Sequence, residues 1–442
     1  MTGSHAPRIL IVGGGYVGMY TALRLQKRLR PGEATITVID PVSYMTYQPF
    51  LPEAAAGNLE PRHVVVPLRR VLPKADILNG RVTRIDHKTR TAWVLPYEGA
   101  EFAISYDVLV MAPGSVARTL PIPGLAEQGI GFKTVAEAIY LRNHVLNRLD
   151  IASTTDDPAI RKRALTFLSI GGGYAGIECL AELEDMARDA MKFYPSLAPK
   201  EMRWVLVEAA GRILPEVSES LGVYTVEQLR ARNIEVRLST RVNSMVGGHV
   251  VLDDGTEFDA DTIIWTAGVK PNPVLHETDL PLDEKDRVKA TEYLTVEGVE
   301  NAWVAGDCAA VPDLTKPGQF TGPSAQHAVR QAARLGDNIV ASLRGQPLRP
   351  YRHAYAGSVA SLGLHKGVAE IYGFKLRGLP AWWMHRTYHL SRVPTLNRKV
   401  RVVTDWTIAL FFRREIVSLG SLQRPREEWE RVALPNTEAR AG

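Results

Sequence analysis

Arg8–Leu25 reads RILIVGGGYVGMYTALRL and Thr166–Leu183 reads TFLSIGGGYAGIECLAEL, so one pattern occurs twice in this chain of 442 residues. Each copy is a short apolar run, then G-G-G-Y-x-G, and then apolar residues at helical spacing. This is the strand, glycine turn and helix with which a dinucleotide-binding unit begins. One such turn is weak evidence, but two copies in matching context predict two dinucleotide sites.

The three glycines of each turn have different tasks. The first allows the tight turn after the strand, the second lets the backbone approach a pyrophosphate, and the third lets the helix pack closely on the strand. The helix N-terminus then presents N–H groups and a partial positive charge to the phosphates. In this order the residues are Gly13, Gly15 and Gly18 in the first copy, with Gly14 inside the turn, and Gly171, Gly173 and Gly176 in the second.

An acidic residue is expected where the second strand of such a unit ends, because it can bind the ribose hydroxyls. Asp40 ends TITVID after the first turn, and Glu208 ends WVLVE after the second. Glu208 comes later than usual, so residues 187–200 are expected to extend the helix and add a loop. An acid here repels a 2′-phosphate and favours NADH over NADPH, whereas the nearby Arg212 leaves that preference open. A surface acid without a ligand is the alternative for Glu208.

A third glycine turn distinguishes the two sites. Residues 301–309 read NAWVAGDCA, a strand ending in Gly306 and Asp307. Flavoproteins with two dinucleotide units place such an aspartate beside the ribityl chain of FAD, which assigns FAD to the first unit. YDVLVMAPGS at 106–115 and DTIIWTAGV at 261–269 resemble the crossovers between the two nucleotide domains. Further cofactor contacts are expected at Val82, Ala112, Gly114, Ala267 and Gly268.

The expected fold is α/β, with two Rossmann-like dinucleotide-binding domains of parallel sheet covered by helices. Residues 1–120 and 275–345 form the FAD-binding domain, which is split by the inserted NADH-binding domain of residues 121–274. Residues 346–442 form a C-terminal helical segment of different composition. Apolar residues make up 45% and charged residues 23%, which is typical of a globular protein with large cores.

Several classes of protein are excluded or disfavoured. No stretch reaches the ~18 apolar residues of a membrane span, and the start lacks the apolar core of a signal peptide, so secretion is not expected. Cys179 and Cys308 are the only cysteines and form no C-x-x-C, which excludes a thioredoxin-reductase type of dithiol and a zinc knuckle. Both thiols are expected to be small packing residues.

The stretch from residue 373 to residue 414 is basic and aromatic, with Asp405 as its one acid. We interpret it as an amphipathic helix on an anionic membrane surface that does not span the bilayer. A helix packed on the core or on a dimer partner is the alternative, and nucleic acid is a third possibility. The predicted apolar stripe is Val402, Val403, Trp406, Ala409 and Leu410. The basic residues are Lys375, Arg377, Arg386, Arg392, Arg398, Lys399, Arg401, Arg413 and Arg414.

Four further segments carry a resemblance to a known family. YQPFLPEAAAG at 47–57 includes Gln48 and Pro49, GGGYAGIE at 171–178 ends in Glu178, and SLGLHKGVA at 361–369 includes Lys366. PSAQHAVRQ at 323–331 includes Ala325, Gln326 and Gln331. With the tail at 377–414, these segments resemble the type II NADH dehydrogenases, single-chain NADH:quinone oxidoreductases of the respiratory membrane. His327 and Arg330 make the fourth segment more polar than the family pattern.

The resemblance implies hydride transfer from NADH to FAD and then two-electron reduction of a lipid quinone, menaquinone or ubiquinone, without proton pumping. It places the protein peripherally on the cytoplasmic side of the membrane, and a homodimer is possible. Glu178 is either part of a proton path or nicotinamide site, or a helix-terminal acid that complements the dipole. Gln326 either meets a flavin or quinone carbonyl or is structural, and Gln331 is expected to line the entrance. Lys366 either places a charge near the flavin or quinone or is solvated.

His385 and His389 have a spacing that could bind zinc, but the tail offers no third ligand, so a surface role is predicted. Two other functions remain open: a soluble reductase of a small redox protein, and an NADH-binding signalling flavoprotein. Sulfide:quinone oxidoreductases share the architecture but require more cysteines, which disfavours that chemistry.

Overall fold

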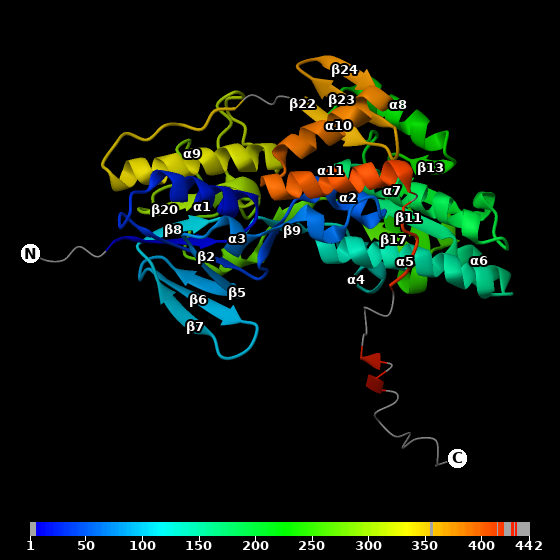
Figure 1. Cartoon of the computed structure of the whole chain (residues 1–442), viewed down its shortest axis with the longest axis horizontal. Helices are drawn as coiled ribbons and strands as arrows, with labels where there is room; N and C mark the ends of the chain where they lie inside the picture. The colour runs from blue at the N-terminus through cyan, green and yellow to red at the C-terminus, as the bar shows by residue number, and fades with distance from the viewer. Residues whose placement is uncertain (1–5, 354–356, 413, 420–425, 428, 431–442) are drawn as a thin grey trace, which may run out of the picture. The chain divides into compact units, whose positions relative to one another are not determined.

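The computed structural model describes residues 6–353, 357–412, 414–419, 426–427 and 429–430 (Figure 1). Arg413 of the basic tail lies outside the described residues. The chain divides into a first unit, residues 1–47, 65–118 and 268–356, and a second unit, residues 48–64, 119–267 and 357–442. The bounds predicted for the FAD-binding, NADH-binding and C-terminal domains stay predictions, because a compact unit is not by itself a binding domain.

The first unit is built on a seven-stranded sheet in the order β20-β8-β1-β2-β5-β6-β7. The strands from β20 to β5 are parallel, and β6 and β7 are antiparallel to their neighbours. All four residues of β8, VLVM, are buried, as expected for a parallel strand covered on both faces. The strands are β20 (Ala302–Val304), β8 (Val108–Met111), β1 (Arg8–Val12), β2 (Thr35–Asp40), β5 (Asp76–Asp86), β6 (Thr91–Pro96) and β7 (Phe102–Ser105).

Helices α1 (Tyr16–Arg28) and α9 (Ala325–Leu343) lie side by side in this unit (Figure 1). Their contact is fixed by Arg24, whose guanidinium donates two hydrogen bonds of 2.8 and 2.7 Å to the Asp337 carboxylate. The smaller elements are α3 (Leu68–Val71), β3 (Tyr44–Thr46) paired with β4 (Val65–Pro67), and β19 (Val288–Lys289) paired with β21 (Ala309–Ala310).

The two predicted crossovers meet in a short antiparallel ribbon of the first unit. It consists of β9 (Ser115–Ala117) and β18 (Val269–Pro271). Asn272 continues the contact, because its backbone N–H donates to the carbonyl oxygen of Gly114 at 3.1 Å. The A-x-G turns therefore direct both chain segments into one ribbon.

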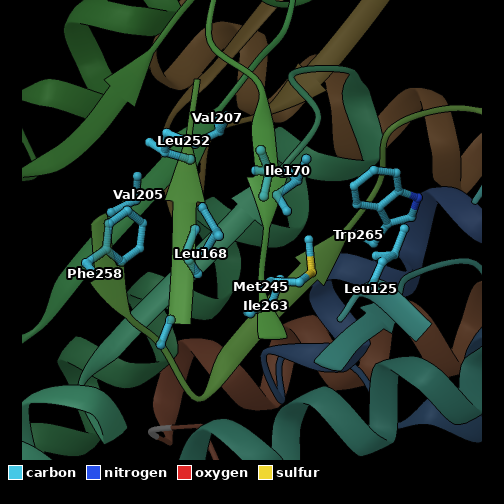
Figure 2. Close-up of a cluster of buried hydrophobic side chains, with 13 residues drawn as sticks. Leu125, Leu168, Ile170, Val205, Val207, Met245, Leu252, Phe258, Ile263 and Trp265 are labelled. Atoms are coloured by element: carbon cyan, nitrogen blue, oxygen red, sulfur yellow. The ribbon is translucent and has the colours of Figure 1, made fainter. Parts of the chain in front are cut away.

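The second unit has a parallel five-stranded sheet in the order β10-β17-β11-β12-β13, and a three-stranded sheet β14-β15-β16. Buried apolar side chains of both sheets form one core, which includes Leu168, Val205 and Ile263 from the first sheet and Leu252 and Phe258 from the second (Figure 2). The strands are β10 (Gly129–Gly131), β17 (Thr262–Trp265), β11 (Thr166–Ile170), β12 (Arg203–Val207), β13 (Ile234–Arg237), β14 (Val242–Ser244), β15 (His249–Leu252) and β16 (Glu257–Asp259).

Some helices of the second unit begin at side-chain caps. Thr134 and Glu137 form a reciprocal capping box at the start of α5, and the Asp157 side chain caps α6. The helices are α2 (Leu51–Ala55), α4 (Leu125–Gln128), α5 (Val135–Thr154), α6 (Pro158–Ala164), α7 (Tyr174–Ala190), α8 (Glu219–Arg230), α10 (Leu379–Arg392) and α11 (Leu396–Phe411). As expected for residues 187–200, α7 is followed by loop and short 3-10 turns.

The C-terminal part of the second unit is an antiparallel sheet followed by α10 and α11. Its strands are β22 (Gly357–Ser361), β23 (Gly367–Ile371) and β24 (Phe374–Arg377). Among the helices that the structure describes, none combines the length and apolar character needed to cross a membrane.

The single apolar stripe predicted for the tail is wrong in detail, because α11 uses its apolar residues on two faces. Val402 is fully buried and Trp406 is half-buried, so these two pack against the second unit itself. Val403 and Leu410 are exposed, and Ala409 is exposed as well. The helix therefore combines core packing with an outward apolar face.

Candidate functional site

The first glycine turn has the shape that a dinucleotide cradle requires. Gly13 has a φ of +101°, and a Cβ there would lie 2.2 Å from the carbonyl oxygen of Ala112. At Gly18 a Cβ would lie 1.7 Å from the carbonyl oxygen of Gly13, so only glycine allows α1 to pack this closely. A Cβ on Gly15 would meet no described atom within 4 Å. This opening is where a pyrophosphate can approach the backbone.

The second turn repeats this geometry. Gly171 has a φ of +113°, a Cβ on Gly176 would lie 2.0 Å from the carbonyl oxygen of Gly171, and Gly173 faces open space in the described part of the chain. Gly15 and Gly173 are the N-caps of α1 and α7, and neither helix start has a side-chain cap within the described residues. Both helix N-termini therefore present N–H groups to a phosphate, and the two turns fit the cofactors expected of them.

The two predicted ribose-binding acids hold their turns in the same way. Asp40 accepts hydrogen bonds from the N–H of Gly14 at 2.6 Å and of Val42 at 2.8 Å. Glu208 accepts from the N–H of Gly172 at 2.5 Å and of Ala210 at 2.7 Å. Burial raises the pKa of Asp40, and these N–H bonds oppose that shift. Each carboxylate thus lies beside its glycine turn, where a ribose hydroxyl could also donate a hydrogen bond to it.

The Arg212 guanidinium is bound within its own loop. Its Nη2 donates to the carbonyl oxygens of Val217 at 2.5 Å and Leu214 at 3.3 Å. The Glu208 carboxylate is then the charged group at the end of β12 that is left for a nucleotide.

The Gly306–Asp307 turn is held from two sides within the first unit. Ser115 Oγ donates to Asp307 Oδ2 at 2.7 Å, and the N–H of Gly306 donates to Gln331 Oε1 at 2.7 Å. Gln331 also donates from Nε2 to Thr321 Oγ1 at 3.1 Å and is fully buried. The prediction that Gln331 lines an entrance is therefore wrong, because both ends of its amide fix the turn.

The start of α9 is a polar cluster. Ala325 is its first residue, and Gln326 Oε1 lies 2.9 Å from His353 Nε2. His327 is buried and its Nδ1 lies 2.8 Å from the hydroxyl of Tyr351. Burial lowers the pKa of His353 to about 4. The neutral imidazole can therefore donate to Gln326, and His327 is an internal hydrogen-bonding residue of this unit.

Most of the other predicted cofactor residues lie at the ends of strands or in turns. Ala112 and Gly114 follow β8, and Ala267 and Gly268 follow β17. Val82 is buried in β5, beside a register shift between Val82 and Arg84. Gln48 and Pro49 lie in the 3-10 turn before α2, where Gln48 Nε2 donates to the Lys133 carbonyl oxygen at 3.3 Å.

Cys179 and Cys308 are both buried free thiols. Burial raises the pKa of each, so neither favours the thiolate. This agrees with the packing role predicted for them.

Glu178 is buried in α7 and is only 7% exposed. It lies one residue beyond the first turn, which holds no acid, so the alternative of a helix-terminal acid loses its basis. Burial raises the pKa of Glu178 to about 8, although the N–H of Ser361 donates to Oε1 at 2.8 Å. With this pKa the carboxyl is largely protonated at neutral pH.

Besides Glu178, the second unit buries Glu182 and Glu53, and also Glu184, which is paired with Arg232. Glu182, one turn further along α7, accepts from Ser361 Oγ at 3.1 Å and from Asn58 Nδ2 at 3.0 Å. Glu53 of α2 accepts from Arg386 Nη2 at 2.9 Å and from Trp406 Nε1 at 2.7 Å. Burial raises the pKa of both carboxyls. We call Glu53, Glu178 and Glu182 the acid cluster.

The prediction of surface roles for His385 and His389 is wrong for His385, which is 2% exposed, and His389 is half-buried. Their rings lie 4.6 Å apart, and His385 Nε2 lies 3.0 Å from Glu178 Oε1. Sequence reasoning missed this cluster. One signal was available, because Glu178 and Glu182 are spaced i, i+4 among apolar residues and so share a helix face that must be buried.

Lys366 lies in the turn between β22 and β23, which is fixed on α7. The N–H of Leu364 donates to Asp185 Oδ2 at 2.6 Å, and Arg232 Nη1 donates to the Leu362 carbonyl oxygen at 2.7 Å. Burial raises the pKa of Asp185 to about 6. Lys366 itself is half-buried. Its turn is held against the helix that carries Glu178, but its side chain makes no hydrogen bond or ion pair with the residues that the structure describes.

Two nucleotide cradles with paired acids and a Gly-Asp turn define a dinucleotide-dependent flavoprotein oxidoreductase. The sequence profile of the pyridine nucleotide-disulphide oxidoreductases matches residues 7–332, and the chain belongs to this family. A second profile, the NDH2 C-terminal domain, matches residues 355–415.

Relatives agree with both matches. "Probable NADH dehydrogenase" of Dictyostelium discoideum is 29% identical over 93% of this chain and 91% of its own length. "Type II NADH:quinone oxidoreductase" of Staphylococcus aureus is 29% identical over 86% of this chain and 93% of its own length. The predicted family resemblance is therefore confirmed.

Solved structures confirm the predicted fold class. NDH2 of Plasmodium falciparum, in complex with NADH, has a TM-score of 0.86 at 18% identity and covers 93% of this chain and 99% of its own. Sulfide:quinone oxidoreductase of Aquifex aeolicus has a TM-score of 0.69 at 17% identity and covers 93% of this chain and 96% of its own, which shows a shared fold alone. The family match agrees with FAD and NADH as the predicted cofactors.

Proposed function

We propose that this protein is a non-proton-pumping NADH:quinone oxidoreductase that transfers hydride from NADH to FAD and two electrons to a membrane quinone. The observation that carries the proposal is the combination of two nucleotide cradles with a segment matching the NDH2 C-terminal domain. Bound FAD supplies the two-electron chemistry, and the polypeptide supplies binding, orientation and protons.

Each cradle binds one dinucleotide in this proposal. The first unit holds FAD through the turn beginning at Gly13, the Asp40 carboxylate and the Asp307 turn, with Ala112 and Val82 as further contacts. The second unit holds NADH through the turn beginning at Gly171. Glu208 binds the ribose hydroxyls there and repels a 2′-phosphate, and the retracted Arg212 supports this preference.

Three residues are assigned to the reaction. Glu178 carries a proton, because its burial keeps the carboxyl protonated near neutral pH. Gln326 offers its amide N–H to a flavin or quinone carbonyl, and the contact with His353 supports this by occupying its oxygen. Lys366 places a positive charge near the site of reduction from a turn that α7 holds in place.

The outward face of α10 and α11 docks on the membrane. Its α11 part repeats apolar side chains at i, i+4, i+7 and i+14, with exposed fractions of 76% at Leu396, 56% at Val400, 42% at Val403 and 71% at Leu410. Trp383 of α10 is 52% exposed. We call these five residues the docking face. Lys399 and Arg401 flank it on α11, as suits anionic lipid headgroups.

Docking brings a lipid quinone to the protein without a passage through water. The protein is then peripheral on the cytoplasmic side of the membrane, where NADH is available. The homodimer stays a prediction.

We expect anaerobic NADH to bleach the flavin absorbance and a menaquinone or ubiquinone analogue to restore it. NADPH should bleach it at least about 10-fold more slowly, because like charges a few ångströms apart cost on the order of 1 kcal/mol or more. Stopped-flow spectroscopy measures both half-reactions. Flavin that NADH reduces but neither quinone reoxidises would overturn the proposal and favour a soluble reductase or a signalling flavoprotein.

Replacing Val400, Val403 and Leu410 by Gln should weaken binding to anionic phospholipid vesicles by about 10-fold or more, because each lost apolar side chain contributes on the order of 1 kcal/mol. Vesicle co-sedimentation at several lipid concentrations measures the loss. The matched control replaces three exposed apolar residues outside the docking face, Tyr97, Phe102 and Val246, by Gln. Equal binding by both triple variants would contradict the assignment of the docking face.

A further inference from the structure

The His385 imidazole is a buried base whose position on α10 has no structural explanation so far. Neither ring nitrogen has a hydrogen-bond partner among the residues that the structure describes. Buried polar groups are almost always paired, and an exception calls for a reason. Glu178 Oε1 lies 3.0 Å from Nε2, close but outside hydrogen-bond geometry.

The groups around this pair come from four elements of the second unit. α7 supplies Glu182, α2 supplies Glu53, β22 supplies Ser361, and α10 supplies Arg386 and His389. Further along the chain, Arg414 lies near Asp189 of α7 and lowers the pKa of Glu182. Three buried carboxyls thus share two nearby arginines, and burial raises the pKa of each carboxyl.

The protonation states of the pair follow from this environment. Burial, together with the smaller effect of the nearby Arg386, lowers the pKa of His385 to about 3. Burial raises the pKa of Glu178 to about 8. At neutral pH the resting pair is therefore a protonated acid beside an unprotonated base, which is the arrangement from which a proton can move.

The base belongs to the part of the chain that matches the NDH2 C-terminal domain. Residues 355–415 contain Ser361, His385 and Arg386, whereas Glu178 lies in the nucleotide-binding family region, residues 7–332. The C-terminal match therefore supplies the basic partner of an acid that the nucleotide fold places on α7.

We propose that His385 is the proton partner of Glu178, and that the two residues pass the solvent proton that quinone reduction consumes. This inference rests on the proposed function. NADH, one proton and quinone give NAD⁺ and quinol, so the hydride brings both electrons and one hydrogen, and solvent must supply the second proton. The Glu178 O–H bond breaks as the proton leaves toward the quinone. Solvent then protonates the His385 imidazole from the side of half-buried His389, and the imidazolium N–H breaks as Glu178 is reprotonated, which returns both residues to their resting states.

His385→Gln should slow flavin reoxidation by a quinone analogue about 100-fold, as for loss of a general acid–base group, and should leave flavin reduction by NADH within twofold. Stopped-flow traces from pH 5.5 to 9 measure both half-reactions. In His385→Ala, added imidazole should restore at least a tenth of the lost rate, and the restored rate should follow the titration of free imidazole.

His144→Gln is the matched control, because His144 is a buried histidine of the same unit that is paired with the Asp261 carbonyl oxygen and Thr262. It should lower the melting temperature without changing the pH profile of reoxidation. If His385→Gln does not retain flavin, His385→Asn provides the same comparison. Reoxidation slowed no more than in His144→Gln, or no imidazole rescue, would overturn the inference alone. A wild-type protein that quinone cannot reoxidise would instead overturn the proposed function and this inference with it.

Discussion

Gly18→Ala should yield a protein with less than about a tenth of the wild-type flavin, whereas Gly176→Ala should retain its flavin and lose NADH binding. In each case the new Cβ would lie 2.0 Å or less from the carbonyl oxygen of the first turn glycine, so the helix must move away from the turn. Overpacking of this kind costs about 1–3 kcal/mol or more. It also removes the N–H groups that bind the pyrophosphate from their positions. Flavin absorbance per polypeptide and NADH titration by fluorescence measure the two losses.

Gly15→Ala and Gly173→Ala separate ligand contact from helix packing. A Cβ at either position meets no described atom within 4 Å, so the protein without ligand should melt within a few degrees of wild type. The methyl group would nevertheless occupy the approach of the pyrophosphate. We expect at least about 10-fold weaker binding of FAD for Gly15→Ala and of NADH for Gly173→Ala, since a displaced phosphate contact costs about 1.4 kcal/mol or more. Normal binding in both variants would show that these turns are structural only.

The nucleotide fold could be predicted from the sequence because its rules are local. A run such as RILIV followed by glycines at fixed spacing specifies the strand, the turn and the helix within one stretch of chain. The acids followed from the same rule, and Asp40 and Glu208 both contact the turn predicted for them. The third glycine of each turn also packs as expected, because its task is set by the chain only five residues before it.

Apart from the spacing of Glu178 and Glu182, the acid cluster could not be predicted, because it is assembled from distant segments. Glu53 meets Arg386 and Trp406 only through the packing of α2 on the C-terminal helices. The sequence predicts surface positions for the histidines of α10, because the tail around them is basic. Burial of one face of α10 depends on tertiary contacts that no helical period reveals, and the same contacts divide the apolar residues of α11 between two faces.

Glu178→Gln should make the free energy of unfolding much less dependent on pH between about 4.5 and 8. Burial raises the pKa of Glu178 from its ordinary value of 4.5 to about 8 in the folded protein. In this interval the folded state holds a proton that the unfolded state releases, so stability falls as pH rises, by up to about 1.4 kcal/mol per pH unit. The neutral amide cannot ionise and removes that slope. Glu53 and Glu182 remain in both proteins, so their raised pKa values largely cancel in the difference.

Urea unfolding at half-unit pH intervals measures the slope, and Glu227→Gln, at an exposed position of α8, is the control that should leave it unchanged. The variant should gain stability over wild type toward pH 8 and lose that advantage toward pH 5. This sign separates a buried neutral acid from an ion-paired carboxylate, whose stabilising effect would instead grow with pH. Parallel curves for wild type and Glu178→Gln would mean that the carboxyl does not hold a proton at neutral pH, and its role as a proton carrier would fail with it.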